Sequence, residues 1–170
     1  MSRIEWIVCE RSRHWSTALS TALGRADWTP RSVPRLFEVR QLSELTARLD
    51  ARPDSLAVVE VQRANLSDVL VWLAEAGRLY PLARFAALAE RELCASVESG
   101  PASRPGHRQP VIDALREAGA GEVVTSPRQL QGILALGRRH ASLRAVRHDS
   151  PPADTSIAAW VWQSLPWQDE

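Results

Sequence analysis

The stretch that decides the fold is Leu56-Ala57-Val58-Val59-Glu60-Val61. It is apolar without the alternation typical of a half-exposed strand, so we expect a central parallel strand that helices cover on both faces. Further strands are predicted over residues 4–9, 36–39, 85–89 and 123–124. Helices are predicted between and after them, because apolar residues recur three and four positions apart. The helical sets are Trp15, Ala18, Leu19 and Ala22; Leu42, Leu45 and Leu49; Leu66, Val69, Leu70 and Leu73; Val111, Ala114, Leu115 and Ala118; and Leu130, Ile133, Leu134, Gly137 and Ala141.

Five strands that alternate with helices indicate an α/β fold, since each right-handed crossover packs its helix against a parallel sheet. Gly24 is expected to end the first helix, and Ser43 to lie near the start of the second. Residues 98–110 are rich in glycine and proline, and a short connection does not need them. We therefore predict an insertion there.

Composition narrows the range of functions. The chain has 170 residues, of which 45% are hydrophobic, enough for one domain with a short appendage. All 21 cationic side chains are arginine, and the formal net charge is +1, so we expect neither nucleic-acid nor membrane binding. No apolar run approaches the roughly 20 residues that a membrane span needs, and the expected location is cytoplasmic.

Two segments resemble parts of a bacterial response-regulator receiver domain. Residues 41–60 are similar to its second helix and third strand. Residues 114–127, with Ala-Gly-Ala before the last strand and proline after it, are similar to its fourth helix and fifth strand. The resemblance spans roughly residues 3–147. It implies a flavodoxin-like sheet of five parallel strands in the order 2-1-3-4-5, with any site at the carboxyl ends of the strands.

The residues at the site positions depart from the family pattern. The resemblance places Glu60 where an aspartate ends the third strand and accepts the phosphoryl group, and Cys9 and Glu10 where an acidic pair holds magnesium. Ala89 stands in place of the hydroxyl residue, and Ser126 in place of the lysine. Without a lysine, a transferred phosphoryl group lacks its usual charge neutralisation. We therefore expect a vestigial phosphorylation pocket with no catalytic residue, no metal and no cofactor.

Glu60 admits two interpretations. One methylene longer than aspartate, it could imitate a permanently phosphorylated residue, but Ala89, Ser126 and Val123 offer such a mimic weak partners. The favoured interpretation is a polar residue at a strand end, either solvated or paired with a nearby arginine.

The two cysteines also have structural interpretations. Cys9 and His14 make a nucleophile–base pair only if their side chains converge, and the spacing identifies no third group. A disulfide between Cys9 and Cys94 is not expected, because the third strand would separate them.

Two basic segments are expected to be solvated. One lies on the insertion and is a candidate for binding an anion over the pocket. The other lines one side of the last helix, and we do not expect it to bind nucleic acid. They comprise Arg104, His107 and Arg108, and Arg138, Arg139, His140, Arg144 and Arg147.

The C-terminal segment is the clearest functional signal. A linker is predicted over residues 148–156, and residues 157–170 hold Trp160, Trp162 and Trp167. Exposing three indoles is costly, because each can remove about 150–250 Å² from solvent. We expect this tail to pack on its own domain or on a partner. Leu136 and Leu143 of the last helix are predicted to form the receiving ridge.

These observations predict a phosphorylation-independent, non-enzymatic interaction module in bacterial signalling or regulation. It would bind a protein partner or a second copy of itself, forming a homodimer through the last helix and the tail. The alternative is a small-ligand or anion sensor that uses Glu10, Glu60 and Ser126 at the carboxyl edge of the sheet.

Overall fold

The computed structural model describes residues 4–28, 34–95 and 110–149. Five strands form one parallel sheet in the order β2-β1-β3-β4-β5, which confirms the predicted fold class and strand order. Every residue of β3 is buried, as its apolar residues without alternation predict, and the buried set includes the one charged residue of the strand, Glu60. The strands are β1 (Glu5–Cys9), β2 (Arg35–Val39), β3 (Leu56–Val61), β4 (Arg84–Ala89) and β5 (Glu122–Val124).

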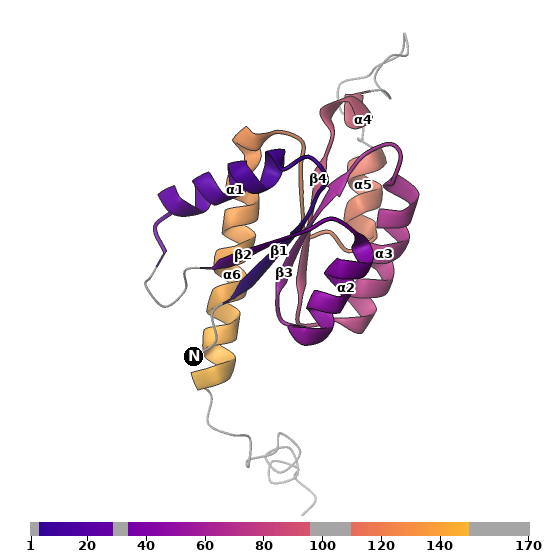
Figure 1. The fold of residues 1–170 in the computed structure, drawn as a ribbon. Helices are drawn as coiled ribbons and strands as arrows, with labels where there is room; N and C mark the ends of the chain where they lie inside the picture. The colour runs from indigo at the N-terminus through magenta and orange to yellow at the C-terminus, as the bar shows by residue number, and fades with distance from the viewer. Residues whose placement is uncertain (1–3, 29–33, 96–109, 150–170) are drawn as a thin grey trace, which may run out of the picture.

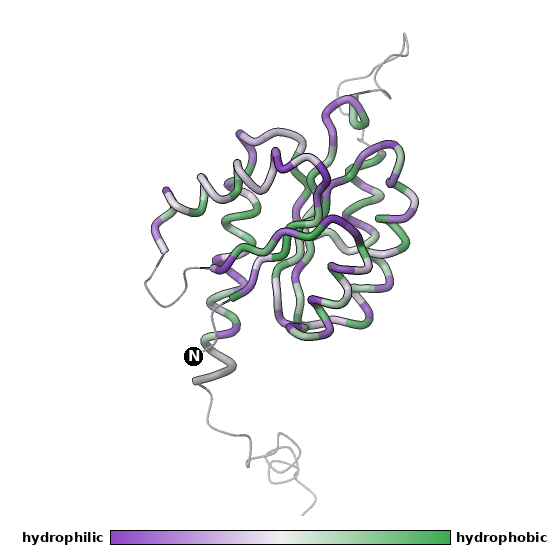
Figure 2. The backbone as a smooth tube through the Cα atoms, viewed as in Figure 1, coloured by the Kyte–Doolittle hydropathy of each residue, from purple (hydrophilic) through white to green (hydrophobic). Residues whose placement is uncertain are grey.

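Helices cover both faces of the sheet (Figure 1). Two helices, α1 (His14–Arg25) and α6 (Gln131–Asp149), pack on one face. The other face carries α2 (Leu42–Ala51), α3 (Leu66–Leu79) and α5 (Pro110–Glu117). A short helix α4 (Arg91–Ala95) follows β4, and the 3-10 turn η1 (Pro127–Gln129) precedes α6. Figure 2 shows hydrophobic residues concentrated along the central strands and polar residues around the periphery.

The first helix does not end where it was predicted to end. It continues through Gly24 to Arg25, and the backbone becomes extended at Ala26. No atom crowds Gly24, and it keeps helical geometry rather than the left-handed conformation of a C-terminal glycine.

Two further boundaries differ from the predictions. Helix α4 was not predicted, because its five residues carry too short a pattern, although Leu93 and Cys94 are buried in the core. Helix α6 runs through Asp149, two residues into the predicted linker 148–156. Of the predicted insertion 98–110, only Pro110 lies within the described residues, and it begins α5.

Helix α6 approaches the sheet closely at Gly137. A Cβ atom at this position would lie 2.0 Å from Cζ2 of Trp6, a fully buried side chain of β1. Trp28 packs edge-on against Trp6, with ring centroids 6.0 Å apart. The missing side chain at position 137 therefore permits the short distance between α6 and β1.

Candidate functional site

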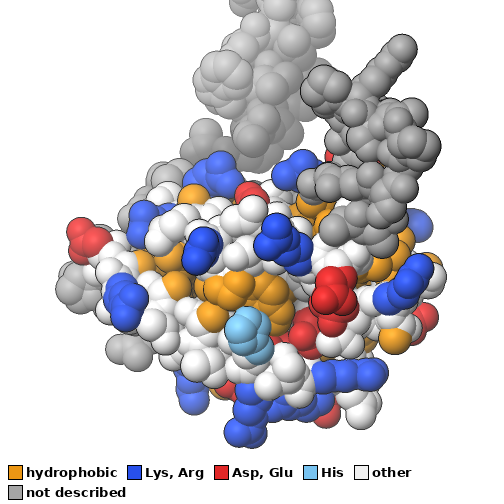
Figure 3. All heavy atoms as spheres, turned by 90° about the horizontal axis from the view of Figure 1, so that it is seen from above, with side chains coloured by type: hydrophobic (Ala, Val, Ile, Leu, Met, Phe, Trp, Pro, Cys, Tyr) orange, Lys and Arg blue, Asp and Glu red, His pale blue; other side chains and the backbone are white. Residues whose placement is uncertain are grey.

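A hollow of about 620 Å³ lies at the carboxyl ends of β1 and β3, beside the first residues of α2 and α3. Cys9, Glu10 and Glu60 line it, so the structure brings together three of the five residues of the predicted vestigial pocket. Ala89 and Ser126 are not among its lining residues. Figure 3 looks down onto this edge of the molecule, where acidic, basic and hydrophobic side chains lie close together.

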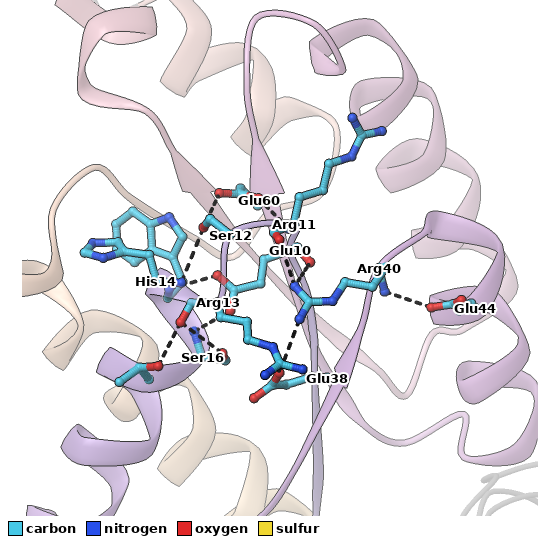
Figure 4. Close-up of polar contacts among 12 residues, drawn as sticks. Glu10, Arg11, Ser12, Arg13, His14, Ser16, Glu38, Arg40, Glu44 and Glu60 are labelled. Atoms are coloured by element: carbon cyan, nitrogen blue, oxygen red, sulfur yellow. Dashed lines mark hydrogen bonds and ion pairs between the residues drawn. The ribbon is translucent and has the colours of Figure 1, made fainter.

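Glu10 caps helix α1 from the end of β1. Its Oε2 accepts a hydrogen bond from the backbone N–H of Trp15 at 2.8 Å, and its Oε1 accepts one from that of Ser16 at 2.7 Å (Figure 4). Arg13, the residue before the helix, has a φ of 61° and makes no side-chain cap, so Glu10 satisfies these N–H groups instead. The helix dipole also favours a carboxylate here. Glu10 is 1% exposed, and both of its oxygens are engaged.

Glu60 holds the loop between β1 and α1. Its Oε2 accepts a hydrogen bond from the backbone N–H of Arg11 at 2.9 Å, and its Oε1 accepts one from the Ser12 hydroxyl at 3.3 Å (Figure 4). Glu60 is 6% exposed, and no arginine of the described ranges forms an ion pair with it. The prediction of a solvated or arginine-paired carboxylate is therefore wrong, because the loop itself supplies the partners.

Arg40, which follows β2, fixes the same loop from the other side. Its Nη1 donates to the backbone carbonyls of Glu10 and Arg11, both at 2.9 Å, and its Nη2 lies 3.8 Å from Oε2 of Glu38. Glu60 thus accepts hydrogen bonds from donor groups of the β1–α1 loop, and Arg40 donates hydrogen bonds to two carbonyl groups of the same loop. Sequence reasoning missed Arg40, because one arginine after a strand has no distinguishing pattern.

The two carboxylates do not fit the magnesium ion that the receiver resemblance implies. Magnesium requires several oxygen ligands in a near-octahedral arrangement. Each Oε atom of Glu10 and Glu60 instead accepts a hydrogen bond from the β1–α1 loop or from the start of α1. Across the described residues, no three His, Cys, Asp or Glu side chains gather in a way that could hold a metal ion.

Cys9 is a poor nucleophile. Burial, together with the nearby carboxylates of Glu44 and Glu60, raises the pKa of its thiol to about 11, so the thiol stays protonated near neutral pH. His14 is exposed and packs edge-on against Trp15, and no hydrogen bond joins it to Cys9. The structure does not bring this pair together.

Cys94 is a second buried thiol. Both cysteines are free, and burial raises the pKa of the Cys94 thiol as well. They belong to the same hydrophobic cluster on the α2/α3/α5 face, which gives them a packing role.

The other predicted pocket residues have no polar contact with Glu60, although Ala89 pairs in the sheet with Val61, the residue after Glu60. Ala89 is fully buried in the core at the end of β4. Ser126 caps η1, where its Oγ accepts a hydrogen bond from the Arg128 backbone N–H at 3.4 Å. Val123 is buried in the core. None of the three hydrogen-bonds to the Glu60 carboxylate.

The last helix differs from its predicted surface in two places. Leu136 is 7% exposed and packs in the core, so its placement on an exposed ridge is wrong, whereas Leu143 is 53% exposed. His140 was predicted on a solvated basic side but is 3% exposed. Its Nε2–H donates to the carbonyl oxygen of Asp54 at 2.7 Å, and burial lowers its pKa. Arg144 pairs with the Asp54 carboxylate.

The remaining predicted residues fall outside the described part of the chain. They are the tail residues Trp160, Trp162 and Trp167 and the basic residues of the insertion, Arg104, His107 and Arg108.

Comparison with solved structures supports the fold. A response regulator from Thermotoga maritima superposes with a TM-score of 0.60 and 17% sequence identity, over 83% of this chain and 99% of that chain. A CheY-like protein, tadZ, from Pseudomonas aeruginosa gives a TM-score of 0.54 and 18% identity, over 83% of this chain and 94% of that chain. No protein-family model and no curated protein sequence matches the chain. The chain therefore has the flavodoxin-like fold of CheY-like receivers.

None of the described helices has the length and apolar character needed to cross a membrane.

Proposed function

We propose that this chain is a phosphorylation-independent receiver-like module that acts in bacterial signalling or regulation by binding a protein or a second copy of itself. The observation that supports it is the use of Glu10 and Glu60 as hydrogen-bond acceptors for the β1–α1 segment. Both carboxylates that would serve magnesium and phosphoryl chemistry stabilise the fold instead. The proposal includes a cytoplasmic location, no enzymatic activity, and no binding to nucleic acid or membrane.

The geometry around Glu60 adds to this argument. Phosphoryl transfer to a carboxylate needs positive charge beside the developing phosphoryl oxygens. Ala89 is apolar, Ser126 caps η1, and the Arg40 guanidinium is bound to two loop carbonyls. Arg11 also lines the hollow, but its printed contact with Glu60 is through the backbone N–H and not through the guanidinium.

The alternative of a small-ligand or anion sensor receives less support. The hollow exists, but Glu10, Glu60 and Asp68 line it beside Arg11 and Arg40, so an anion would meet three carboxylates. The third residue proposed for such a sensor, Ser126, does not line it.

The experiment that tests the proposed function is incubation of the full chain with acetyl phosphate and magnesium, followed by intact-mass spectrometry. A receiver that carries the aspartate, the hydroxyl residue and the lysine is treated in parallel as a positive control. The proposal predicts no mass increase in this chain under conditions that modify the control. A phosphoryl adduct mapped to Glu60 or Glu10 contradicts it.

A further inference from the structure

A second hollow, of about 840 Å³, lies between α1 and the first turns of α6, and we call it the α1–α6 groove. Figure 1 shows α1 crossing beside the upper part of α6. Small apolar side chains of α1, Ala18 and Ala22, and Leu130 contribute to its wall. Figure 3 shows, from above, a hydrophobic area and a histidine with both arginine and acidic side chains around them.

The rim of the α1–α6 groove is cationic. Arg13, Arg25 and Arg138 line it, and Asp27 is the one carboxylate among the described lining residues. Arg13 lies 3.9 Å from Glu38, but neither Arg25 nor Arg138 forms an ion pair with a carboxylate of the described ranges. The groove thus offers two arginines without an acidic partner beside an apolar wall.

Arg138 already contacts an indole. Its guanidinium carbon lies 5.7 Å from the ring centroid of Trp28, within the range of a cation–π interaction. On this side of the groove, an arginine side chain can therefore lie against a tryptophan ring.

The segment that complements this surface is the end of the same chain. Residues 150–170 contain Asp154, Asp169 and Glu170 and no arginine, together with three tryptophans. Acidic groups suit the two unpaired arginines, and indole faces attract guanidinium groups. Covering the apolar wall also removes indole surface from water.

The chain is long enough to reach the groove within one molecule. From Arg138 to Asp149, helix α6 rises about 16 Å at 1.5 Å per residue. The seven residues 150–156 can span about 23 Å when extended. The tryptophan segment can therefore return antiparallel to α6 and reach Arg138 without a second copy.

We propose that residues 157–170 dock in the α1–α6 groove of their own chain, with their indoles and carboxylates against Arg25 and Arg138. This inference deepens the proposed function, on which it rests for the interaction role of the tail. It replaces the predicted Leu136–Leu143 ridge, of which Leu136 is buried, with a surface that the structure leaves open. A partner that uses this groove must displace the tail.

The test uses full-length protein labelled with 5-fluorotryptophan and observed by ¹⁹F NMR. The three tail resonances are assigned by the single changes Trp160→Phe, Trp162→Phe and Trp167→Phe. Two groove variants are compared with wild type: the double change Arg25→Glu with Arg138→Glu, and Thr21→Glu, which places a carboxylate in the groove and keeps both arginines. The matched control is Arg78→Glu with Arg116→Glu, on exposed residues of α3 and α5.

The proposal predicts dispersed, solvent-protected tail resonances in wild type and in the control. Both groove variants are expected to lose this dispersion and to shift the tail signals toward those of a free indole. Free-indole signals in wild type overturn the proposal, as does an equal change in the control. Tail signals that change with protein concentration overturn it in favour of docking between copies. Phosphorylation of Glu60 would contradict the proposed function and leave these outcomes unaffected.

Discussion

At the scale of single residues, Glu10 and Glu60 lie where the receiver resemblance implies metal and phosphoryl chemistry, yet each accepts hydrogen bonds from its own fold. The cause is local. Arg13 has a left-handed backbone, which lets the start of α1 turn its N–H groups toward the end of β1. The carboxylate of Glu10 then accepts hydrogen bonds from two of these N–H groups.

Replacing Glu10 with alanine is expected to lower the free energy of unfolding by about 1–3 kcal/mol, because two buried N–H groups of α1 lose their acceptor. Chemical denaturation measures the change. Glu38→Ala is the matched control, since Glu38 is exposed and its ion pairs are 3.8 and 3.9 Å long. An exposed pair of this kind contributes less than about 1 kcal/mol. Equal losses in both variants would show that Glu10 has no capping role.

Sequence reasoning identified the positions of Glu10 and Glu60 but not their role. The strand pattern places Glu10 directly after the first strand and Glu60 next to the last residue of the third, so both lie at carboxyl ends. Three of their four hydrogen-bond partners are backbone N–H groups, those of Arg11, Trp15 and Ser16, which carry no side-chain signature, and the fourth is the Ser12 hydroxyl. For the same reason Arg40 was missed, since its acceptors are two carbonyls.

His140 predicts a pH dependence. Burial lowers its pKa from the ordinary 6.5, so the folded protein binds this proton less readily than the unfolded chain does. Its contribution to stability is full above pH 6.5 and is lost as pH falls from there toward the folded-state pKa. His140→Gln keeps a donor for the Asp54 carbonyl and is expected to flatten the decline measured by urea denaturation. His14→Gln, at an exposed position, should leave the decline unchanged; an unchanged decline in His140→Gln would contradict the account.

At the scale of elements, the apolar stripes predicted α1, α2, α3, α5 and α6, whereas packing determines which of their side chains are buried. Leu136 and His140 both face the core because α6 presents a wide inner side to the sheet and to the segment before β3. A stripe of residues three and four apart does not reveal that width. Helix α4 is likewise stabilised by two buried side chains rather than by a periodic pattern.

Gly137→Ala is expected to destabilise the fold by about 3 kcal/mol, because the new methyl group would overlap the Trp6 ring and force α6 away from β1. Gly77→Ala is the control, since Gly77 lies in α3 with no atom near its missing Cβ. At this position the better helix propensity of alanine should raise the free energy of unfolding by about 0.5–1 kcal/mol. Thermal and chemical denaturation of both variants should show changes in stability of opposite sign. A neutral Gly137→Ala would contradict the close approach of α6.

At the scale of the whole molecule, alternation of strands and helices was enough to predict the fold class, and the receiver resemblance supplied the strand order. Each crossover helix has one apolar face and must cover a parallel sheet, which leaves few arrangements. The α1–α6 groove arises only when two helices from opposite ends of the chain meet on one face, so no local pattern predicts it.

Deletion of residues 156–170 measures the contribution of the tail to the whole domain. If the tail docks in its own groove, the deletion lowers the midpoint of thermal unfolding by roughly 5 °C, the size expected for about 2 kcal/mol in a chain of this length. Arg25→Glu with Arg138→Glu should lower it in the same direction. An unchanged midpoint after the deletion would favour a tail that contacts other molecules only.

The central claim is that Glu10 and Glu60 are occupied by the β1–α1 segment and do not serve magnesium or a phosphoryl group. The most direct measurement is ¹⁵N NMR of the full chain during titration with magnesium and then beryllium trifluoride, a phosphoryl analogue. The account predicts that the amide signals of Arg11, Trp15 and Ser16, which donate to these carboxylates, stay in place. Saturable shifts of these three amides would contradict it.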